Sequence, residues 1–457
     1  MKNTKVVCTI GPASEEITKL EKLINAGMNV MRMNFSHGDH EEQGARIVSV
    51  KALNEKNNWN VGIMLDTKGP EIRTGYMKEG YADIEQGSTV RVTFDYSYEC
   101  TAEKIALSYA GLYDDIKVGE RILIEDGNLG LLVVGKDEEN RELITEALNS
   151  RRLKNKKNVN VPGVVLNMNY ISEKDYGDFV FGVEQDVDFI AASFVRRPQD
   201  ILDIRKVLAD HNNSNIKIIS KIENQEGVDN MEEIIALSDG VMVARGDLGV
   251  DVPAWEVPAH QKRMIELAQS QGKIVVTATQ MLDSMITNPR PTRAEVSDVF
   301  NAVLDGTSAT MLSGESANGD YPVETVTYMA TIDERAEEDC DYAYFAERAL
   351  SATLTDDPES AVCYAAVRVA AEFGVSAIIA EGTQEFLYKL SGFRPCVNVF
   401  AGVATRQDAR AMAIAYGIYA TVGGLEEALA FGKEKIQLQE GETVLFVTKD
   451  SFKVVTL

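Results

Sequence analysis

The chain alternates between short apolar runs and longer amphipathic stretches. Eight of the runs resemble buried strands, and most are separated by roughly 25 to 35 residues, the length that a strand, a helix and two loops require. Eight such units in succession predict a parallel (β/α)8 barrel. The runs cover residues 6–10, 30–33, 61–65, 189–192, 216–219, 241–244, 274–277 and 309–312.

The interval between the third and fourth runs breaks this spacing. From residue 71 to residue 158 the pattern changes to short pieces with alternating apolar residues, such as 88–94. Turn sequences at 125–128 and 137–140 separate these pieces. Alternation with a period of two is typical of strands with one buried face. We therefore expect a small β domain inserted into a loop of the barrel.

A third pattern begins after about residue 344. Helical periodicity at 360–373 and 407–416 is mixed with strand-like pieces at 377–380, 397–400 and 443–448, of which we expect the last to be the final strand. Helices and strands that alternate in this way predict an open α/β domain. No solenoid repeat or low-complexity linker is present in the sequence.

Composition excludes several classes of partner. The 457 residues include 46 Lys and Arg against 71 Asp and Glu, a formal charge of −25. A nucleic-acid or anionic-membrane binder needs a basic face, so we expect neither partner. The five cysteines are scattered without a CxxC pair, which favours reduced thiols over disulfides or thiolate metal sites. The apolar run that follows residues 1–5 is too brief for a signal-peptide core, and no stretch approaches the length of a membrane span, so we expect a soluble cytoplasmic protein.

Carboxylates follow two neighbouring runs at the predicted carboxyl ends of the strands, where barrel active sites lie. Glu223 and Asp247 have no Cys or clustered His beside them. Such a donor set suits Mg²⁺ or Mn²⁺, with part of the coordination shell left for substrate. Lys221 lies two residues before Glu223 and would sit beside the metal. Ordinary helix capping or salt-bridge roles for both carboxylates remain an alternative.

A second cluster of oxygen donors follows the second and third runs. Asn34, Ser36, Asp66 and Thr67 together carry one formal charge, which suits a monovalent cation better than a divalent one. Turn and capping chemistry favours the same residue types and is an alternative explanation.

Cations near the strand ends would supply the charge that phosphate groups need. Residues 245–249 add a glycine turn whose free N–H groups would approach an anion, although glycine often only permits a turn. The basic run 151–157 is explained more simply as a solvated hinge. We expect no histidine to act as the general base. The strand-end cations are Arg32, Lys68, Arg73 and Lys221.

Six ordered blocks, spread over most of residues 1–335, resemble the pyruvate kinase family. They are 4–14 (TKVVCTIGPAS), 29–38 (NVMRMNFSHG), 65–74 (LDTKGPEIRT), 219–224 (ISKIEN), 242–249 (MVARGDLG) and 288–295 (NPRPTRAE). Six blocks in order are far more specific than a lone glycine motif. The resemblance implies a (β/α)8 TIM barrel over residues 1–70 and 159–344, an inserted β-barrel lid over 71–158, and a regulatory-type open-sheet α/β domain over 345–457.

The resemblance also implies the reaction. Phosphoenolpyruvate would transfer its phosphoryl group to ADP, and the enolate, held by Mg²⁺ and Lys221, would then be protonated to pyruvate. By this resemblance Arg32 binds the substrate phosphate, Lys221 stabilises the moving phosphoryl group, and further substrate contacts come from Gly246, Asp247 and Thr279. Mg²⁺ or Mn²⁺ is bound by Glu223 and Asp247, and K⁺ by Asn34, Ser36, Asp66 and Thr67. The nucleotide is contacted by Arg73 and Lys157, with Asn34, Ser36 and His37 lining that side; the proton arrives from the side of Thr279 and an ordered water, with Ser313 as a relay. Glu71 is the residue type found at this position in family members that need K⁺. The family is commonly a homotetramer.

The chain departs from the family pattern in its last region. Where a Ser/Thr- and Gly-rich loop is usual, residues 381–386 contain Glu381 and Glu385, whose carboxylates would repel a sugar phosphate. The tail 449–457 also lacks the usual glycine-containing loop. We therefore expect activation by phosphosugars such as fructose 1,6-bisphosphate to be absent or altered.

Two other functions share part of this pattern. A Mg²⁺-dependent aldolase or lyase acting on pyruvate would use the Lys, Glu and Asp residues but would not need Arg73, Lys157 or the inserted lid. A catalytically idle paralogue would serve as a regulatory or scaffold protein, and the intact set of site residues argues against it.

Overall fold

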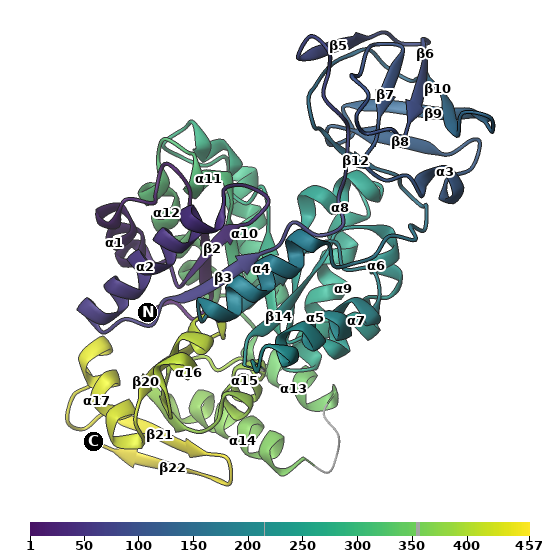
Figure 1. Cartoon of the computed structure of the whole chain (residues 1–457). Helices are drawn as coiled ribbons and strands as arrows, with labels where there is room; N and C mark the ends of the chain where they lie inside the picture. The colour runs from purple at the N-terminus through teal and green to yellow at the C-terminus, as the bar shows by residue number, and fades with distance from the viewer. Residues whose placement is uncertain (214, 353–356) are drawn as a thin grey trace.

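A closed eight-stranded parallel barrel forms the centre of the molecule (Figure 1). The computed structural model describes residues 1–213, 215–352 and 357–457. The barrel order is β1-β17-β16-β15-β14-β13-β3-β2, as the eight apolar runs predict. The strands are β1 (Lys5–Thr9), β2 (Val30–Asn34), β3 (Gly62–Asp66), β13 (Phe189–Ala192), β14 (Lys217–Ile222), β15 (Gly240–Ala244), β16 (Ile274–Ala278) and β17 (Ala309–Leu312). All but β14 end within one residue of the prediction; β14 continues three residues further, so Lys221 lies on the strand itself.

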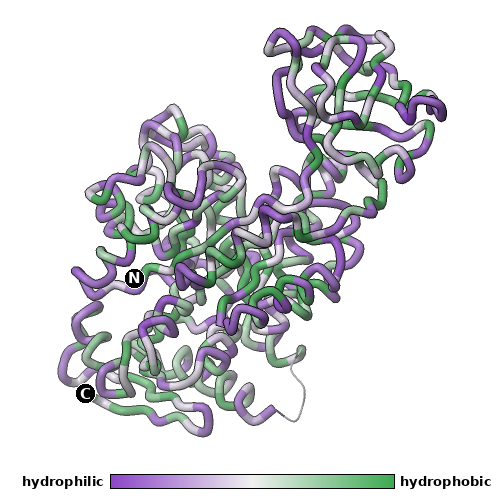
Figure 2. The backbone as a smooth tube through the Cα atoms, in the orientation of Figure 1, coloured by the Kyte–Doolittle hydropathy of each residue, from purple (hydrophilic) through white to green (hydrophobic). Residues whose placement is uncertain are grey.

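The barrel interior is filled with side chains. Val7, Met64, Ile219 and Met242 are fully buried there. Strands covered on both faces read as continuous apolar runs, which explains why the runs were visible in the sequence. Figure 2 shows apolar residues concentrated in the barrel and in the C-terminal sheet, with polar residues along the outer loops. The outer helices are α1 (Ile17–Ala26), α2 (His40–Asn57), α4 (Glu173–Glu184), α5 (Pro198–Asp210), α7 (Met231–Leu237), α9 (Val257–Ser270), α10 (Arg293–Asp305) and α12 (Pro322–Glu337).

Short helices follow several barrel strands at their carboxyl ends. They are α6 (Gln225–Asp229), α8 (Arg245–Asp251), the 3₁₀ helix η1 (Asp283–Ile286) and α11 (Gly314–Ala317). The glycine turn predicted at 245–249 is therefore the first part of α8.

The inserted segment forms a β domain that stands away from the barrel (Figure 1). Its main sheet has the order β4-β12-β8-β9-β10-β6-β7, and β5 pairs with β11. The predicted turns at 125–128 and 137–140 follow β8 and β9. The basic run was misjudged as a hinge, because its first part is strand β11. The elements are β4 (Ile72–Arg73), β5 (Tyr81–Ile84), β6 (Thr89–Thr93), β7 (Lys104–Ala106), α3 (Leu112–Asp115), β8 (Arg121–Ile124), β9 (Leu129–Asp137), β10 (Glu142–Ala147), β11 (Arg151–Lys154) and β12 (Asn158–Asn160).

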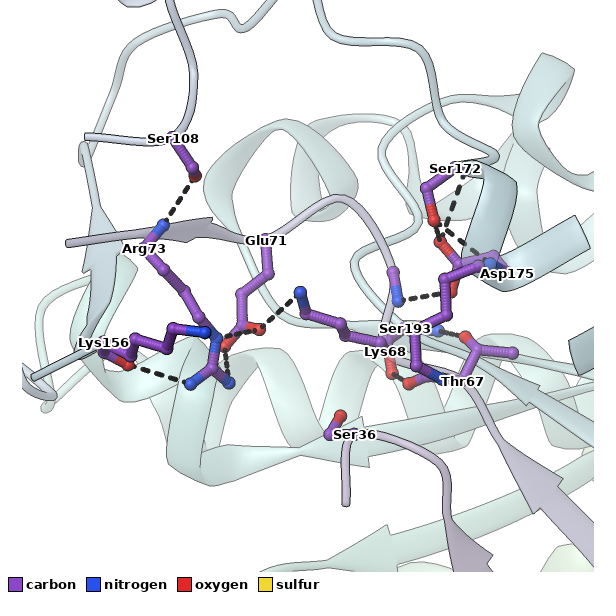
Figure 3. Close-up of polar contacts among 12 residues, drawn as sticks. Ser36, Thr67, Lys68, Glu71, Arg73, Ser108, Lys156, Ser172, Asp175 and Ser193 are labelled. Atoms are coloured by element: carbon purple, nitrogen blue, oxygen red, sulfur yellow. Dashed lines mark hydrogen bonds and ion pairs between the residues drawn. The ribbon is translucent and has the colours of Figure 1, made fainter. Parts of the chain in front are cut away.

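Both connections between the β domain and the barrel are anchored by barrel side chains. The backbone N–H of Gly69 donates to Asp175 Oδ1 at 3.0 Å, in the capping box that begins α4 (Figure 3). Gly69 has φ +70°, and a Cβ there would lie 2.7 Å from the carbonyl oxygen of Ser193. At the returning connection, Arg196 Nη1 and Nη2 donate to the carbonyls of Leu166 and Met168 at 3.0 and 2.8 Å.

The C-terminal region is an open α/β sheet of order β20-β19-β18-β21-β22. Only β22 is antiparallel to its neighbour. The elements are α13 (Tyr342–Ala352), α14 (Pro358–Phe373), β18 (Ala377–Glu381), α15 (Gln384–Gly392), β19 (Val399–Val403), α16 (Arg406–Ala411), the 3₁₀ helix η2 (Met412–Ile414), β20 (Ile418–Val422), α17 (Leu425–Ile436), β21 (Thr443–Thr448) and β22 (Ser451–Thr456).

Our prediction that 443–448 is the last strand is wrong, because β22 folds back onto β21 as a hairpin. Its Phe452 and Val454 stay 38% and 40% exposed, so β22 has no buried face whose alternation would mark it. Among the described residues no helix has the length and hydropathy needed to cross a membrane.

Candidate functional site

An arginine and an aspartate meet at the carboxyl end of the barrel. Asn34 at the end of β2 lies opposite Asp66 at the end of β3. Arg32, only 7% exposed, donates from Nε to Asp66 Oδ2 at 2.6 Å and from Nη1 to Thr9 Oγ1 at 2.7 Å. Burial alone would raise the pKa of Asp66, but Arg32 and Lys221 outweigh burial and lower it. Asp66 is therefore ionised and fixes the guanidinium of Arg32.

Lys221 lies at the centre of this end of the barrel. Its Nζ is 2.7 Å from Ser193 Oγ, 3.0 Å from Asp66 Oδ1 and 3.0 Å from Glu223 Oε1. Burial opposes the charge of the ammonium group, yet the two carboxylates outweigh it and raise the pKa of Lys221. The barrel therefore holds a permanent cation here, on a rigid strand and almost out of solvent.

Glu223 and Asp247 form an acidic pair beside Lys221; Glu223 is buried and Asp247 is half-buried. Glu223 is 1% exposed, and its Oε2 accepts from the backbone N–H of Phe194 at 2.6 Å. Within the described part of the chain, Oε1 of Glu223 is buried without a hydrogen-bond partner and forms an ion pair with Lys221. The pKa of Glu223 is raised to about 7, chiefly by burial; Lys221 opposes this shift and the carboxylate of Asp247 adds to it. Burial also raises the pKa of Asp247.

Lys221 is shared between Glu223 and Asp66, so it does not fully neutralise the carboxylates of Glu223 and Asp247. Hard oxygen donors in such an environment fit a divalent cation such as Mg²⁺. No group of three or more His, Cys, Asp or Glu side chains suited to a metal occurs among the described residues. A cation held by this pair would therefore take the rest of its coordination shell from water and substrate.

The predicted neutral oxygen cluster also assembles. Asn34 Oδ1 accepts from the backbone N–H of Ser36 at 3.0 Å. The carbonyl of Thr67 accepts from Ser193 Oγ at 2.6 Å, and Thr67 Oγ1 accepts from Ser193 N–H at 3.1 Å (Figure 3). Each of these oxygens has a second lone pair. With one carboxylate, that of Asp66, the donor set fits a monovalent cation.

Thr279 connects the end of β16 to the start of α8. Its Oγ1 accepts from the backbone N–H of Gly246 at 3.0 Å and donates to the carbonyl of Ala278 at 2.6 Å. We expected free N–H groups in the segment 245–249, but that of Gly246 is bonded to this hydroxyl. The reason is the left-handed backbone of Thr279, with φ 68°, which sequence periodicity does not reveal.

Ser313 follows β17 on the same side of the barrel. Its backbone N–H donates to Glu315 Oε2 at 2.7 Å. Its Oγ is buried and has no hydrogen-bond partner among the described residues. A hydroxyl in this state has both a donor and an acceptor to offer to a ligand or a water.

Arg73 and Lys157, the two cations of the inserted β domain, are paired with acidic side chains of the same domain. Arg73 on β4 donates from Nε and Nη2 to the two carboxylate oxygens of Glu71 at 2.8 and 2.9 Å (Figure 3). Lys157, just before β12, lies 2.7 Å from Glu125 Oε1. His37 is exposed in the turn before α2. The structure therefore brings Arg73 on β4 close to Lys157, which precedes β12, the strand paired with β4, while Asn34, Ser36 and His37 belong to the barrel.

We did not predict two of the residues that support this site, Thr9 and Ser193. Thr9 ends β1 and accepts from Arg32; Ser193 follows β13 and accepts from Lys221. Ser193 directly follows the fourth run, and applying the strand-end rule there would have found it. Thr9 lies inside the first predicted run and was counted as part of the strand.

Comparisons with known proteins point to one family. A family model described as the pyruvate kinase barrel domain matches residues 1–326. The pyruvate kinase of Bacillus licheniformis is 49% identical over 427 residues, which is 93% of this chain and 72% of that protein. The pyruvate kinase of Geobacillus stearothermophilus is 47% identical over 421 residues, 92% of this chain and 71% of that protein.

The same likeness holds in three dimensions. A crystal structure of a pyruvate kinase from Cryptosporidium parvum superposes with a TM-score of 0.95 at 38% identity, covering 100% of this chain and 96% of that one. The chain therefore belongs to the pyruvate kinase family, the glycolytic enzymes that convert phosphoenolpyruvate and ADP into pyruvate and ATP.

Proposed function

We propose that the residues at the carboxyl end of the barrel carry the phosphoryl transfer, in the roles that the family resemblance implies. The observation that supports this most strongly is the position of Lys221, a permanent cation within 3.0 Å of Asp66, Ser193 and Glu223. Phosphoryl transfer depends on fixed charges that position the donor and stabilise the moving group. A lysine held on a strand supplies such a charge without reorganisation.

Arg32 and Lys221 bind the phosphate of phosphoenolpyruvate. Among the described contacts of Arg32, Nε and Nη1 are used by Asp66 and Thr9, while Nη2 donates to no protein acceptor. Nη2 is therefore available to a phosphate oxygen. Gly246, Asp247 and Thr279 contact the rest of the substrate at the junction of β16 and α8.

Glu223 and Asp247 hold Mg²⁺ or Mn²⁺, which supplies Lewis-acid stabilisation of developing negative charge. Asn34, Ser36, Asp66 and Thr67 hold K⁺. The fit of both donor sets rests on their composition, which is two excess carboxylates in one and mostly neutral oxygens in the other. Lys221 remains beside both sets and neutralises charge on the transferred group.

Arg73 and Lys157 bind the nucleotide after exchanging their lid carboxylates for its phosphates, and Asn34, Ser36 and His37 line the barrel side. A lid that closes over the nucleotide excludes water that would otherwise intercept the phosphoryl group. Thr279 and an ordered water lie on the side from which the enolate is protonated, and Ser313 relays the proton through its unpartnered hydroxyl.

A coupled assay with phosphoenolpyruvate and ADP, with and without Mg²⁺ and K⁺, tests these assignments together. Pyruvate formation that requires both cations supports them, whereas full turnover without Mg²⁺ removes the proposed metal site. The family resemblance further supports a homotetramer in the cytoplasm, which light scattering on the purified protein and fractionation of cells would test.

Potassium dependence follows from Glu71, which lies 3.9 Å from Lys68 and binds Arg73. Replacing K⁺ with a bulky organic cation at constant ionic strength should lower kcat by about 10-fold or more, because a fixed positive charge is lost. Glu71→Lys should restore most of the activity without K⁺. Glu71→Gln, which removes the acid without adding a cation, is the matched control and should stay K⁺-dependent. Full activity of the parent enzyme without K⁺ contradicts the site.

Insensitivity to phosphosugars follows from Glu381 at the end of β18. Its Oε2 accepts from the backbone N–H of Leu425 at 3.3 Å, and Glu427 Oε2 accepts from that of Gly424 at 2.8 Å. Two carboxylates thus cover the start of α17, where an anionic ligand would be favoured. We expect fructose 1,6-bisphosphate to change the phosphoenolpyruvate concentration for half-saturation by less than about twofold, because the two carboxylates repel its phosphate groups. A large decrease in half-saturation would disprove this prediction.

A further inference from the structure

The backbone at the end of β16 is strained. Thr279 and Gln280 both have left-handed backbones, with φ 68° and 54°. A β-branched residue is a genuine outlier in this region, because its Cβ substituents crowd the backbone. Strain of this kind persists only where the surroundings hold it in place. Neighbouring side chains must therefore hold Thr279 in this conformation.

One side chain from α8 reaches the strained carbonyl. Arg245 donates from Nη2 to the carbonyl of Thr279 at 2.8 Å and from Nε to the same oxygen at 3.2 Å. Its Nε also lies 3.2 Å from the carbonyl of Ala278. A planar guanidinium that donates two N–H groups to one oxygen fixes the direction of that carbonyl, and with it the peptide that joins Thr279 to Gln280.

The guanidinium is itself held from the other side. Asp298, on α10, lies 2.7 Å from Arg245 Nη1, and Gln261, on α9, accepts from the same nitrogen at 3.4 Å. The side chain of Arg245 is only 14% exposed. In such a place a charge-assisted hydrogen bond is stronger and better directed than on the surface.

We propose that Arg245, oriented by Asp298, is a positioning residue that keeps Thr279 in the left-handed conformation from which its hydroxyl meets Gly246. The contact between Thr279 Oγ1 and Gly246 N–H, 3.0 Å long, joins the two segments that contact substrate. Arg245 acts through the backbone of Thr279 and does not touch the reacting atoms. The inference rests on the substrate and protonation roles proposed above for Thr279.

The first test is Arg245→Met, which keeps the length of the side chain and removes its donors. We expect kcat to fall about 10- to 100-fold, the usual cost of a small misplacement at a reacting centre. The KM for ADP should change little, because the lid residues Arg73 and Lys157 are not involved. Arg263→Met is the matched control, since Arg263 has a comparable 2.7 Å ion pair with Glu232 on the outside of the barrel. This control should keep the activity of the parent.

A double-mutant cycle separates positioning from general structural support. In a Thr279→Ala background, Arg245→Met should lower kcat by less than about threefold, because residues that act as a unit are not additive. Gln280→Gly should restore part of the activity of Arg245→Met, since glycine adopts the left-handed region without strain. Asp298→Asn, which keeps the shape of the side chain, should give a smaller loss than Arg245→Met. Circular dichroism and thermal unfolding would confirm that each variant is folded.

The outcomes distinguish the proposed role of Thr279 in the site from the proposed positioning role of Arg245. If Thr279→Ala retains full turnover, the role of Thr279 is wrong, whatever the arginine variants do. If Thr279→Ala is impaired but Arg245→Met is active, the positioning role is wrong while the site stands. If the two losses multiply, or Gln280→Gly fails to restore a folded Arg245→Met variant, Arg245 does not act through the backbone of Thr279.

Discussion

Lys221→Met should lower kcat by about 10²- to 10³-fold while phosphoenolpyruvate still binds, because a fixed charge at the moving phosphoryl group matters most in the transition state. Methionine keeps the volume of the side chain and removes the ammonium group. That group is the common partner of Asp66, Ser193 and Glu223 in the structure. Steady-state kinetics would measure the loss, and calorimetric titration with phosphoenolpyruvate would show that binding persists.

Removing the ammonium group also leaves buried carboxylates without their cation, so loss of activity must be separated from loss of fold. Breaking a buried ion pair typically costs about 3 to 5 kcal/mol of folding free energy. Denaturant unfolding of Lys221→Met measures that cost directly. Ser193→Ala is the matched control: it deletes one anchor of Lys221 but leaves the charge in place, and its kcat should fall far less. A Lys221→Met variant that turns over at the parental rate would remove the lysine from the mechanism.

The barrel was predictable from the sequence because its strands are buried on both faces. Each run of four or five apolar residues corresponds to a strand, and the interval between residues 71 and 158 to an inserted sheet. The strand-end rule then located most of the polar residues that meet at one end of the barrel. Burial and position along a strand are both determined by the order of residue types, so the sequence records them.

Elements without a buried face were not predictable in the same way. Strand β22 exposes Phe452 and Val454, and strand β11 carries Arg151 and Arg152 on its exposed positions. In both, pairing with a neighbouring strand supplies the stability, and hydropathy along the chain does not record pairing. The left-handed backbone of Thr279 is similar, because Arg245 and Asp298 impose it from distant parts of the sequence.

Ion pairs that form only in the folded chain could not be predicted from the sequence either. The family resemblance assigns Arg73 and Lys157 to the same nucleotide, yet only the structure shows that Glu71 and Glu125 neutralise them. These carboxylates compete with the phosphates that the two cations would bind. Arg73 and Lys157 would therefore bind a nucleotide only by exchanging a carboxylate for a phosphate.

Glu223→Gln should abolish most of the response to Mg²⁺. The glutamine carbonyl can still accept from the N–H of Phe194, so the local fold should persist, but the negative charge on the oxygen that has no hydrogen bond in the described structure is lost. We expect the Mg²⁺ concentration for half-activation to rise at least about 10-fold, since hard divalent cations are bound chiefly by carboxylate charge. We expect kcat at saturating Mg²⁺ to fall about 100-fold, because stabilisation of developing charge is lost.

Binding of Mn²⁺, followed by electron paramagnetic resonance, gives a readout of the same site that does not depend on turnover. Asp251→Asn is the matched control. Asp251 is a nearby carboxylate at the end of α8 whose pKa burial also raises, but it accepts from the backbone N–H of Gln225 and has no proposed metal role. Its variant should bind Mn²⁺ as the parent does. If Glu223→Gln binds Mn²⁺ with parental affinity, the metal lies elsewhere. If both variants lose binding equally, the total negative charge around α8 determines Mn²⁺ affinity and Glu223 is not a specific ligand.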